Sequence, residues 1–379
     1  GGTMTLKGTV RIGNNQGSDG TYKLTGGELR NDSSYQVVGY QGKGTFEQSG
    51  GTNRVNTHLF MAEQSSANAT YKMTGGTATV GSHLCVGGNT GAAGGTGTLT
   101  VDNGELRVTN TLLVWGGGTV TINGGKVYAD IVDNTHGGTF NLNGGELHVR
   151  EFRGNLNNNG GTVSPGSSPG TTTITGNYFQ GPGGTLQIEL SNVFDILDVS
   201  GQMTLGGNLE VLPYNGFTLT SGLSFDCLNW GSLAGQFDSL NLPTLPGGVN
   251  WNLASLYTNG QLNLAALTGP FAVTGTVRDA NLNGLSGVTV TATVGAVPAG
   301  TTTTDGQGNY TLSLPVGTYT ITPTIPTQPL TTFQPANRQV VVAGPQSGVD
   351  FAVTGAASVY NLRGTVRDAN GSTLAGVTV

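Results

Sequence analysis

Short runs of alternating polar and apolar residues, each followed by a glycine pair, repeat through the first 160 residues. In one copy, residues 119–122 alternate, Gly124-Gly125 follows, and residues 126–128 begin the next run. Alternation of period two predicts a β-strand with one buried face, and a glycine pair suits a corner because glycine takes positive φ without steric cost. Each copy is therefore expected to form a strand, a glycine corner and a second strand.

A further short apolar run precedes many of these copies, so about three strands are expected per period. These runs lie at residues 37–38, 84–86, 112–115 and 131–132. The glycine pairs, or an Asn-Gly pair in the same place, begin at residues 26, 50, 75, 103, 124, 144 and 160, at intervals of 16 to 28 residues. Repeats of this length predict a β-solenoid, whose coils bury their inner faces only by stacking.

The predicted solenoid extends over residues 1–267. It should contain roughly eleven coils and be about 50 Å long, at one strand spacing per coil. Glycine-pair repeats occupy 1–161 and less regular coils occupy 162–216. The segment 217–267 is more aromatic and is expected to cap the open core, because a solenoid needs an atypical terminal unit.

A different repeat occupies residues 268–379. The letters GTVRDAN at 275–281 return 89 residues later at 364–370. Strand-like runs separated by turn residues between the two copies are typical of a small β-sandwich. We predict an immunoglobulin-like domain at 268–355 and the start of a second, truncated one at 356–379. Since repeats run off both ends, the chain is expected to be a fragment of a longer protein.

Both parts resemble known families. The repeat GTYKLTGGELR at 20–30, with GGTLQIE at 183–189 and FDILDVSG at 194–201, resembles the β-helical passenger regions of bacterial autotransporter-type and related secreted surface proteins. That resemblance implies a right-handed parallel β-helix and export to the cell surface. The repeat from 268 onward resembles carboxypeptidase-regulatory-like and related immunoglobulin-like modules of bacterial surface proteins, which implies a spacer role.

Charge is scarce and unevenly distributed. Charged residues make up 9% of the chain, against about 25% in an average globular protein, and the net charge is −6. No Lys or Arg occurs between Arg153 and Arg278. This balance argues against a nucleic-acid partner, and no apolar run approaches the 18 or so residues of a membrane span. A catalytic groove needs several acids beside Lys or Arg, so we expect neither an enzyme nor a cofactor.

His58 and His83 occupy equivalent positions in adjacent repeats and should stack about 4.8 Å apart. Two stacked imidazoles could hold a metal ion, but the next coil offers Thr111 or Leu112 instead of a third ligand. A plain ladder of side chains is the favoured interpretation, and a metal site is the weak alternative.

For two groups of acidic residues, a functional site and a simple turn are again the two interpretations. Asp195 and Asp198 could form the carboxylate pair of a glycan-cleaving site, or they could cap turns, which the lack of nearby Lys or Arg favours. Asp305 with Asn309 could bind Ca²⁺, but the Asp-Gly turn of a hairpin explains the same residues without an ion.

Cys85 and Cys227 are the only cysteines, and Cys85 lies in an apolar run. A small buried hydrophobe is the favoured interpretation of Cys85 over a disulfide with Cys227. Four aromatic residues could serve carbohydrate binding or could simply pack: Tyr35, Tyr40, Trp115 and Tyr128.

Two classes of function remain. The first is an extracellular or cell-surface structural or adhesive protein: a rigid β-helical rod with immunoglobulin-like spacers, part of a stalk, sheath or filament that contacts copies of itself or neighbouring molecules. The second is a polysaccharide-binding or polysaccharide-degrading protein, since parallel β-helices also host such enzymes. The low density of charge favours the first class, and contact with surface glycans is compatible with both.

Overall fold

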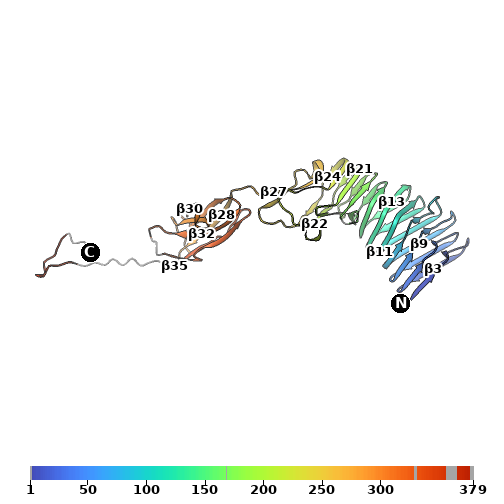
Figure 1. The fold of residues 1–379 in the computed structure, drawn as a ribbon, viewed down its shortest axis with the longest axis horizontal. Helices are drawn as coiled ribbons and strands as arrows, with labels where there is room; N and C mark the ends of the chain where they lie inside the picture. The colour runs from blue at the N-terminus through green and yellow to red at the C-terminus, as the bar shows by residue number, and fades with distance from the viewer. Residues whose placement is uncertain (1, 168, 328–330, 356–364, 376–379) are drawn as a thin grey trace. The chain divides into compact units, whose positions relative to one another are not determined.

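The computed structural model describes residues 2–167, 169–327, 331–355 and 365–375. The chain divides into two compact units, of which the first contains the residues up to Pro246 and Asn250–Ala265, and the second contains the rest. The first unit is a solenoid of stacked coils, seen in Figure 1 from β3 (Asp19–Leu24) to β24 (Leu228–Gly235), and the second contains a β-sandwich. The all-β prediction of a parallel solenoid followed by an immunoglobulin-like sandwich is confirmed.

Each coil contributes a strand segment to each of three faces, and the strands within a face are parallel. Face one consists of β1 (Thr3–Leu6), β4 (Glu28–Asn31), β7 (Thr52–Val55), parts of β9 (Asn68–Val80), β11 (Thr96–Trp115), β13 (Lys126–His136) and β15 (Glu146–Arg153), then β17 (Thr162–Pro165), β20 (Thr185–Leu190), β22 (Asn208–Pro213) and β25 (Ser239–Asn241). Face two consists of β2 (Val10–Ile12), β5 (Gln36–Val38), β8 (Leu59–Met61), β10 (Leu84–Val86), the ends of β11, β13 and β15, then β18 (Thr171–Ile174) and the starts of β21 (Ile196–Leu205) and β24.

Face three completes the coil. It consists of β3, β6 (Lys43–Gln48), the starts of β9 and β11, then β12 (Gly118–Ile122), β14 (Thr139–Leu142), β16 (Leu156–Asn158), β19 (Tyr178–Gln180) and the ends of β21 and β24. Among the described residues, face one therefore has about eleven strand segments and the other faces about ten each, which makes about nine to ten turns. The count is slightly below the roughly eleven coils predicted, because part of the final segment leaves the solenoid.

The glycine pairs form one corner of the coils in this region, although Asn103 takes the first place in one of them. The second glycine of the pairs from Gly27 to Gly145 has positive φ, for example 70° at Gly125 and 67° at Gly145. A Cβ on Gly125 would lie 2.4 Å from the carbonyl oxygen of Gly104 on the preceding coil. A Cβ on the first glycine, Gly124, would lie 2.3 Å from the oxygen of Asp102. Both positions thus exclude a side chain because the neighbouring backbone already fills the space.

The interior of the solenoid is apolar but holds a buried polar network near the same corner. The Tyr71 hydroxyl donates to the side chain of Gln48 at 2.6 Å and accepts a hydrogen bond from Asn53 at 3.2 Å. The amide of Gln48 in turn donates to the backbone oxygens of Gly51 and Thr77 at 3.2 Å and 2.9 Å. Buried polar side chains persist when they are hydrogen-bonded, and here they satisfy backbone carbonyls at the turn.

A second apolar cluster lies on the outer side of face two, where period-two alternation would place solvent-facing residues. It consists of Val37, Phe60, Cys85 and Leu113, which are 0%, 7%, 0% and 8% exposed. These residues form one column in register from coil to coil. The aromatic side chains that pack against the column are Tyr35, Tyr40 and Trp115. The column then continues with charged residues, Asp133 and Arg153, instead of apolar ones.

The segment 217–267, expected to be a cap throughout, has two parts in the structure. It supplies β24 and β25 of the last coil. The remainder forms a small sheet of β23 (Ser224–Asp226), β27 (Gln261–Ala266) and β26 (Val249–Asn252) with the one-turn helix α1 (Leu256–Asn259), preceded by a 3₁₀ turn at Tyr214–Gly216. The Gly260 carbonyl accepts hydrogen bonds from the N–H groups of Cys227 and Leu228, at 3.1 Å and 3.2 Å, and so covers the last strand of face two.

The sandwich packs two four-stranded sheets against each other. One contains β31 (Asn309–Leu314), β28 (Phe271–Arg278), β35 (Phe351–Gly355) and β33 (Thr332–Gln334), and the other contains β30 (Val297–Thr303), β29 (Thr289–Val294), β32 (Gly317–Thr324) and β34 (Arg338–Val342). The core between them includes Val277 and Leu312 from the first sheet and Val290 and Ile321 from the second.

The expected second domain at 356–379 lies outside the described residues except for 365–375. In that part, Asp368 accepts backbone hydrogen bonds from Asn370 and Ser372 at 2.9 Å and 2.8 Å. Asp279 accepts the equivalent bonds from Asn281 and Asn283 at 2.9 Å and 2.8 Å. The repeated residues therefore form the same local turn in both copies.

The corner packing predicts that Gly125→Ala destabilises the solenoid more than a positive φ alone can explain. Gly137 is the matched control, because its φ is 80° and a Cβ added there would have no neighbour nearer than 3.9 Å. We expect Gly137→Ala to cost about 1–2 kcal/mol from backbone conformation. Gly125→Ala should cost about 1–3 kcal/mol more because of overpacking. Urea unfolding followed by circular dichroism measures both, and equal losses would contradict the stacking argument.

Candidate binding groove

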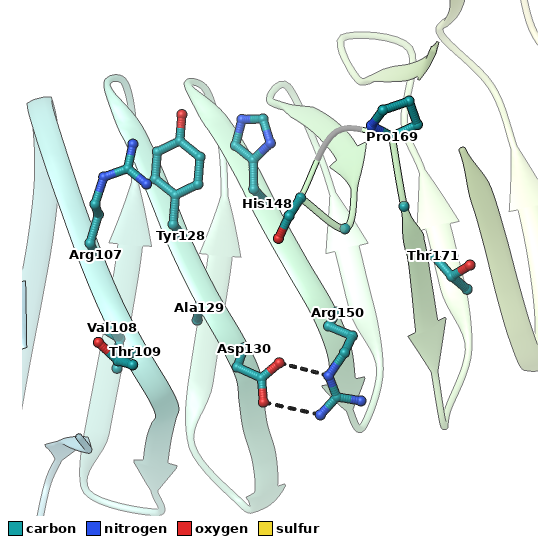
Figure 2. Close-up of a pocket in the computed structure, with 13 residues that line it drawn as sticks. Arg107, Val108, Thr109, Tyr128, Ala129, Asp130, His148, Arg150, Pro169 and Thr171 are labelled. Atoms are coloured by element: carbon teal, nitrogen blue, oxygen red, sulfur yellow. Dashed lines mark hydrogen bonds and ion pairs between the residues drawn. The ribbon is translucent and has the colours of Figure 1, made fainter. Parts of the chain in front are cut away.

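A groove of about 550 Å³ crosses β11, β13 and β15 and ends beside β18. Figure 2 shows two rows of side chains that extend away from each other, with Ala129 between them. The first row consists of Arg107, Tyr128 and His148, and the second of Thr109, Asp130 and Arg150. Because the strands are in register, successive members of the first row come from successive coils.

The first row is a continuous stack of planar groups. The guanidinium carbon of Arg107 lies 3.9 Å from the centroid of the Tyr128 ring. The rings of Tyr128 and His148 lie 4.5 Å apart with an interplanar angle of 12°. Arg107 Nε also donates to Glu105 at 2.5 Å, and His148 Nε2 lies 3.2 Å from Glu146. Both faces of Tyr128 are therefore covered, and its edge borders the groove.

The cations beside the groove are paired with carboxylates. Arg150 makes a two-pronged contact with Asp130, with Nε and Nη2 at 2.6 Å and 3.1 Å from the two carboxylate oxygens. Lys126 lies 2.8 Å from Glu146, next to the first row. Together with the contact between Arg107 and Glu105, these pairs balance the charge around the groove.

One end of the groove is lined by Gly166, Ser167, Pro169 and Gly170, and Figure 2 shows Pro169 there. Gly166 and Gly170 approach so closely that a Cβ on Gly166 would lie 2.7 Å from the Gly170 Cα. The N–H of Gly166 donates to Thr172 Oγ1 at 3.1 Å, and the N–H of Gly170 donates to Asp195 Oδ1 at 2.7 Å. Buried side chains thus fix both glycines of the loop.

The two carboxyl groups nearest the first and second rows have lowered pKa values. The hydrogen bond from Arg150 lowers the pKa of Asp130. Burial tends to raise the pKa of Glu146, but the hydrogen bonds from Lys126 and His148 outweigh it and leave that pKa lowered. Glycoside hydrolysis usually requires one carboxyl group with a raised pKa to protonate the leaving oxygen. Neither of these two groups has that property.

His58 and His83 lie on adjacent coils, with ring centroids 5.3 Å apart and ring planes tilted by 40°. Burial and the neighbouring His83 lower the pKa of His58. The pairing of Leu84 with Leu112 puts Thr111 at the next position of the column. Across the described residues, no group of three His, Cys, Asp or Glu side chains is arranged to hold a metal ion. The geometry is that of a side-chain ladder.

Asp195 and Asp198 occupy different environments and do not resemble a catalytic pair. Asp195 is 0% exposed and accepts hydrogen bonds from the N–H groups of Gly170 and Glu189, at 2.7 Å and 2.9 Å. Asp198 is half-buried in β21, between the inward-facing Leu197 and Val199. Asp195 caps turns in the way the sequence favoured, and it supports the loop at the end of the groove.

Asp305 likewise forms a turn without requiring an ion. Its carboxylate accepts hydrogen bonds from the N–H groups of Gln307 and Asn309, at 2.9 Å and 2.8 Å, and from the Asn309 amide at 3.3 Å. These bonds lower the pKa of Asp305. They account for the Asp-Gly-Gln-Gly-Asn segment as a hairpin connection.

The two cysteines are free and buried. Burial raises the pKa of the Cys85 thiol to about 12, as expected of a small hydrophobe in an apolar cluster. Tyr35, Tyr40 and Trp115 pack against that same cluster. Of the four aromatic candidates, Tyr128 alone lines the groove described above.

Sequence reasoning singled out Tyr128 but missed its neighbours Arg107, His148, Asp130 and Arg150. A signal was present: Arg107, Tyr128 and His148 each follow the second residue of a corner pair by three positions, at 104, 125 and 145. Equal offsets from the corner place side chains in one column. That rule identifies the row but does not reveal the loop that turns it into a groove.

Residues 272–354 match the carboxypeptidase regulatory-like domain family. The matched range covers the sandwich and agrees with the resemblance seen at 268–355. A search of curated proteins gave no match to the chain. The family match does not extend to the solenoid, so kinship with autotransporter passenger regions stays a hypothesis. In the parts of the chain described, no helix is long and apolar enough to cross a membrane.

The burial of Asp195 predicts a specific pH dependence of stability. Burial raises its pKa to about 7, although the two backbone hydrogen bonds favour the ionised form. An unfolded Asp titrates near 4. Between about pH 4 and pH 7 the folded chain therefore retains a proton that the unfolded chain releases, so this group's contribution to stability is fully present below pH 4 and is lost as the pH rises through 7.

We expect Asp195→Asn to remove this contribution, so that its melting temperature falls less than that of the parent protein between pH 4 and pH 7.5. Asp198→Asn, the same substitution three residues away, should follow the parent. Thermal melts at matched ionic strength provide the comparison. If the Asp195→Asn and Asp198→Asn curves coincide across this range, the argument from burial is wrong.

Proposed function

We propose that this chain is a structural component of an extracellular or cell-surface assembly, with the solenoid as a rigid rod and the sandwich as a spacer. The supporting observation is the set of three parallel ladders that joins each coil to the next. Bending such a stack requires opening backbone hydrogen bonds on one face. The resemblance of both parts to modules of bacterial surface proteins agrees with this role.

We further propose that the rod associates laterally with copies of itself through face three. Six threonines there form one outward column in register: Thr21, Thr45, Thr70, Thr98, Thr119 and Thr139. The column carries methyl and hydroxyl groups and no charge, and it repeats at one strand spacing. A second copy presents the same spacing, so the two columns can meet without leaving a charge unpaired.

Adhesion to glycans without cleavage is the second candidate, and the groove favours it. Tyr128, Asp130 and Arg150 carry hydrogen-bond donors and acceptors of the kind that bind sugar hydroxyls. Cleavage is not proposed, because Asp130 in the groove and Glu146 beside it both have lowered pKa values.

Surface location is testable on intact cells of the source. Protease added outside the cells, followed by mass spectrometry, should release peptides from the solenoid before the membrane is broken. A cytosolic enzyme measured in the same samples serves as the control for lysis. Peptides that appear only after lysis would overturn the proposed location.

The threonine column makes a second prediction. We expect the double substitution Thr98→Lys/Thr119→Lys to weaken lateral association, because it places like charges at adjacent levels of the interface. The control is Thr52→Lys/Thr77→Lys, which alters a paired outward position on face one. Sedimentation velocity over a range of concentrations measures association. A parent protein that stays monomeric, or a control that dissociates equally, would contradict the proposed interface.

A further inference from the structure

We propose that the groove over Ala129 binds the terminal residue of an uncharged saccharide. This inference deepens the second candidate function, glycan binding without cleavage, and rests on it, but it does not depend on where the rod is located. It rests on the shape of the groove, on the charge balance of its walls and on the mixture of donors and acceptors they carry.

The size and lining fit one small polar ligand. The volume of about 550 Å³ falls within the range of about 300–1,000 Å³ typical of ligand sites. Val108 and Ala129 are buried, so the strand backbone forms the floor between the two rows, and Thr109 and Thr171 supply hydroxyls at the sides. A sugar ring has the same mixed character, with C–H groups on its faces and hydroxyls around its edge.

The charge balance selects an uncharged ligand. Arg107 and Arg150 are bound to Glu105 and Asp130 at 2.5 Å and 2.6 Å. An anionic sugar would have to compete with one of these carboxylates for its guanidinium. Sugar hydroxyls can instead accept from the guanidinium groups and donate to the carboxylates while both pairs stay intact.

The contacts expected for the sugar differ from aromatic stacking. Arg107 and His148 cover the two faces of Tyr128, at 3.9 Å and 4.5 Å. The sugar therefore meets the edge of the Tyr128 ring and the plane of the Asp130–Arg150 pair. Hydrogen bonds to these groups form only when a sugar hydroxyl points in the right direction, so we expect the groove to discriminate between sugars that differ in the orientation of one hydroxyl.

The closed end selects a terminus instead of the middle of a chain. Pro169 lies at that end in Figure 2, and Asp195 holds the adjoining Gly170 through a 2.7 Å hydrogen bond. A polymer entering from the open end would meet the loop and could not continue along the solenoid. The terminal residue, or a single-residue branch, is the part that fits.

Binding is tested on the full chain with a panel of uncharged trisaccharides built from glucose, galactose, mannose or N-acetylglucosamine, beside trigalacturonate. Titration calorimetry should show that at least one uncharged trisaccharide binds, with an affinity unchanged between 50 and 500 mM NaCl, since no charged pair is formed or broken. No uncharged trisaccharide binding at tens of millimolar, or preference of the parent protein for trigalacturonate, would overturn the proposal.

Three variants locate the site. Tyr128→Ala should weaken binding at least tenfold, whereas Arg54→Ala, in the same outward column but outside the groove, should leave it within twofold. Asp130→Asn keeps the shape but removes the two-pronged partner of Arg150 and leaves it only the longer 3.7 Å contact with Glu151, so it should lose affinity for the uncharged sugar and gain affinity for trigalacturonate. Thermal melts check that each variant is folded. Equal binding by Tyr128→Ala and Arg54→Ala, or no change of preference in a folded Asp130→Asn, would overturn the assignment.

Discussion

The corner of each coil is set by one close approach, in which the backbone of one coil occupies the space where a side chain of the next would lie. At Gly125 and Gly145 this contact coincides with positive φ, so two independent restrictions fall on one residue. The corner then fixes where every following residue points, because the strand after it begins in the same register on each level. The columns of threonine, charge and aromatic side chains all follow from that alignment.

This dependence explains why the sequence predicted the fold well. Glycine pairs and period-two alternation are local signals, and they directly specify the strand, the corner and the inner face. The placement of His58 and His83 side by side on adjacent coils followed from counting residues after the corner. Sequence reasoning was less successful where the chain departs from the repeat: residues 217–267 contribute strands to the last coil before they form the cap.

The groove and the outer apolar cluster could not be derived in the same way. Both depend on loops between strands, whose course is not encoded by the repeat. Cys85 was expected to be buried, but period two places it on the outer side of its strand, where aromatic residues cover it. The loop held by Asp195 turns an exposed row containing Tyr128 into a groove. Contacts between coils and loops are tertiary, and no local sequence pattern predicts them.

The outer column of face two has an apolar part, from Val37 to Leu113, between charged Arg11 on one side and charged Asp133 on the other, and this has a consequence for how such a protein can evolve. Uniform repeats can gain or lose a whole copy by recombination, since any coil fits on any other. Here a duplicated or deleted coil near Leu113 would place apolar and charged residues of the column next to each other in new combinations. Changes in copy number should therefore be tolerated within the apolar part of the column and selected against where it meets a charged residue, so the outer surface determines where coils can be added or lost.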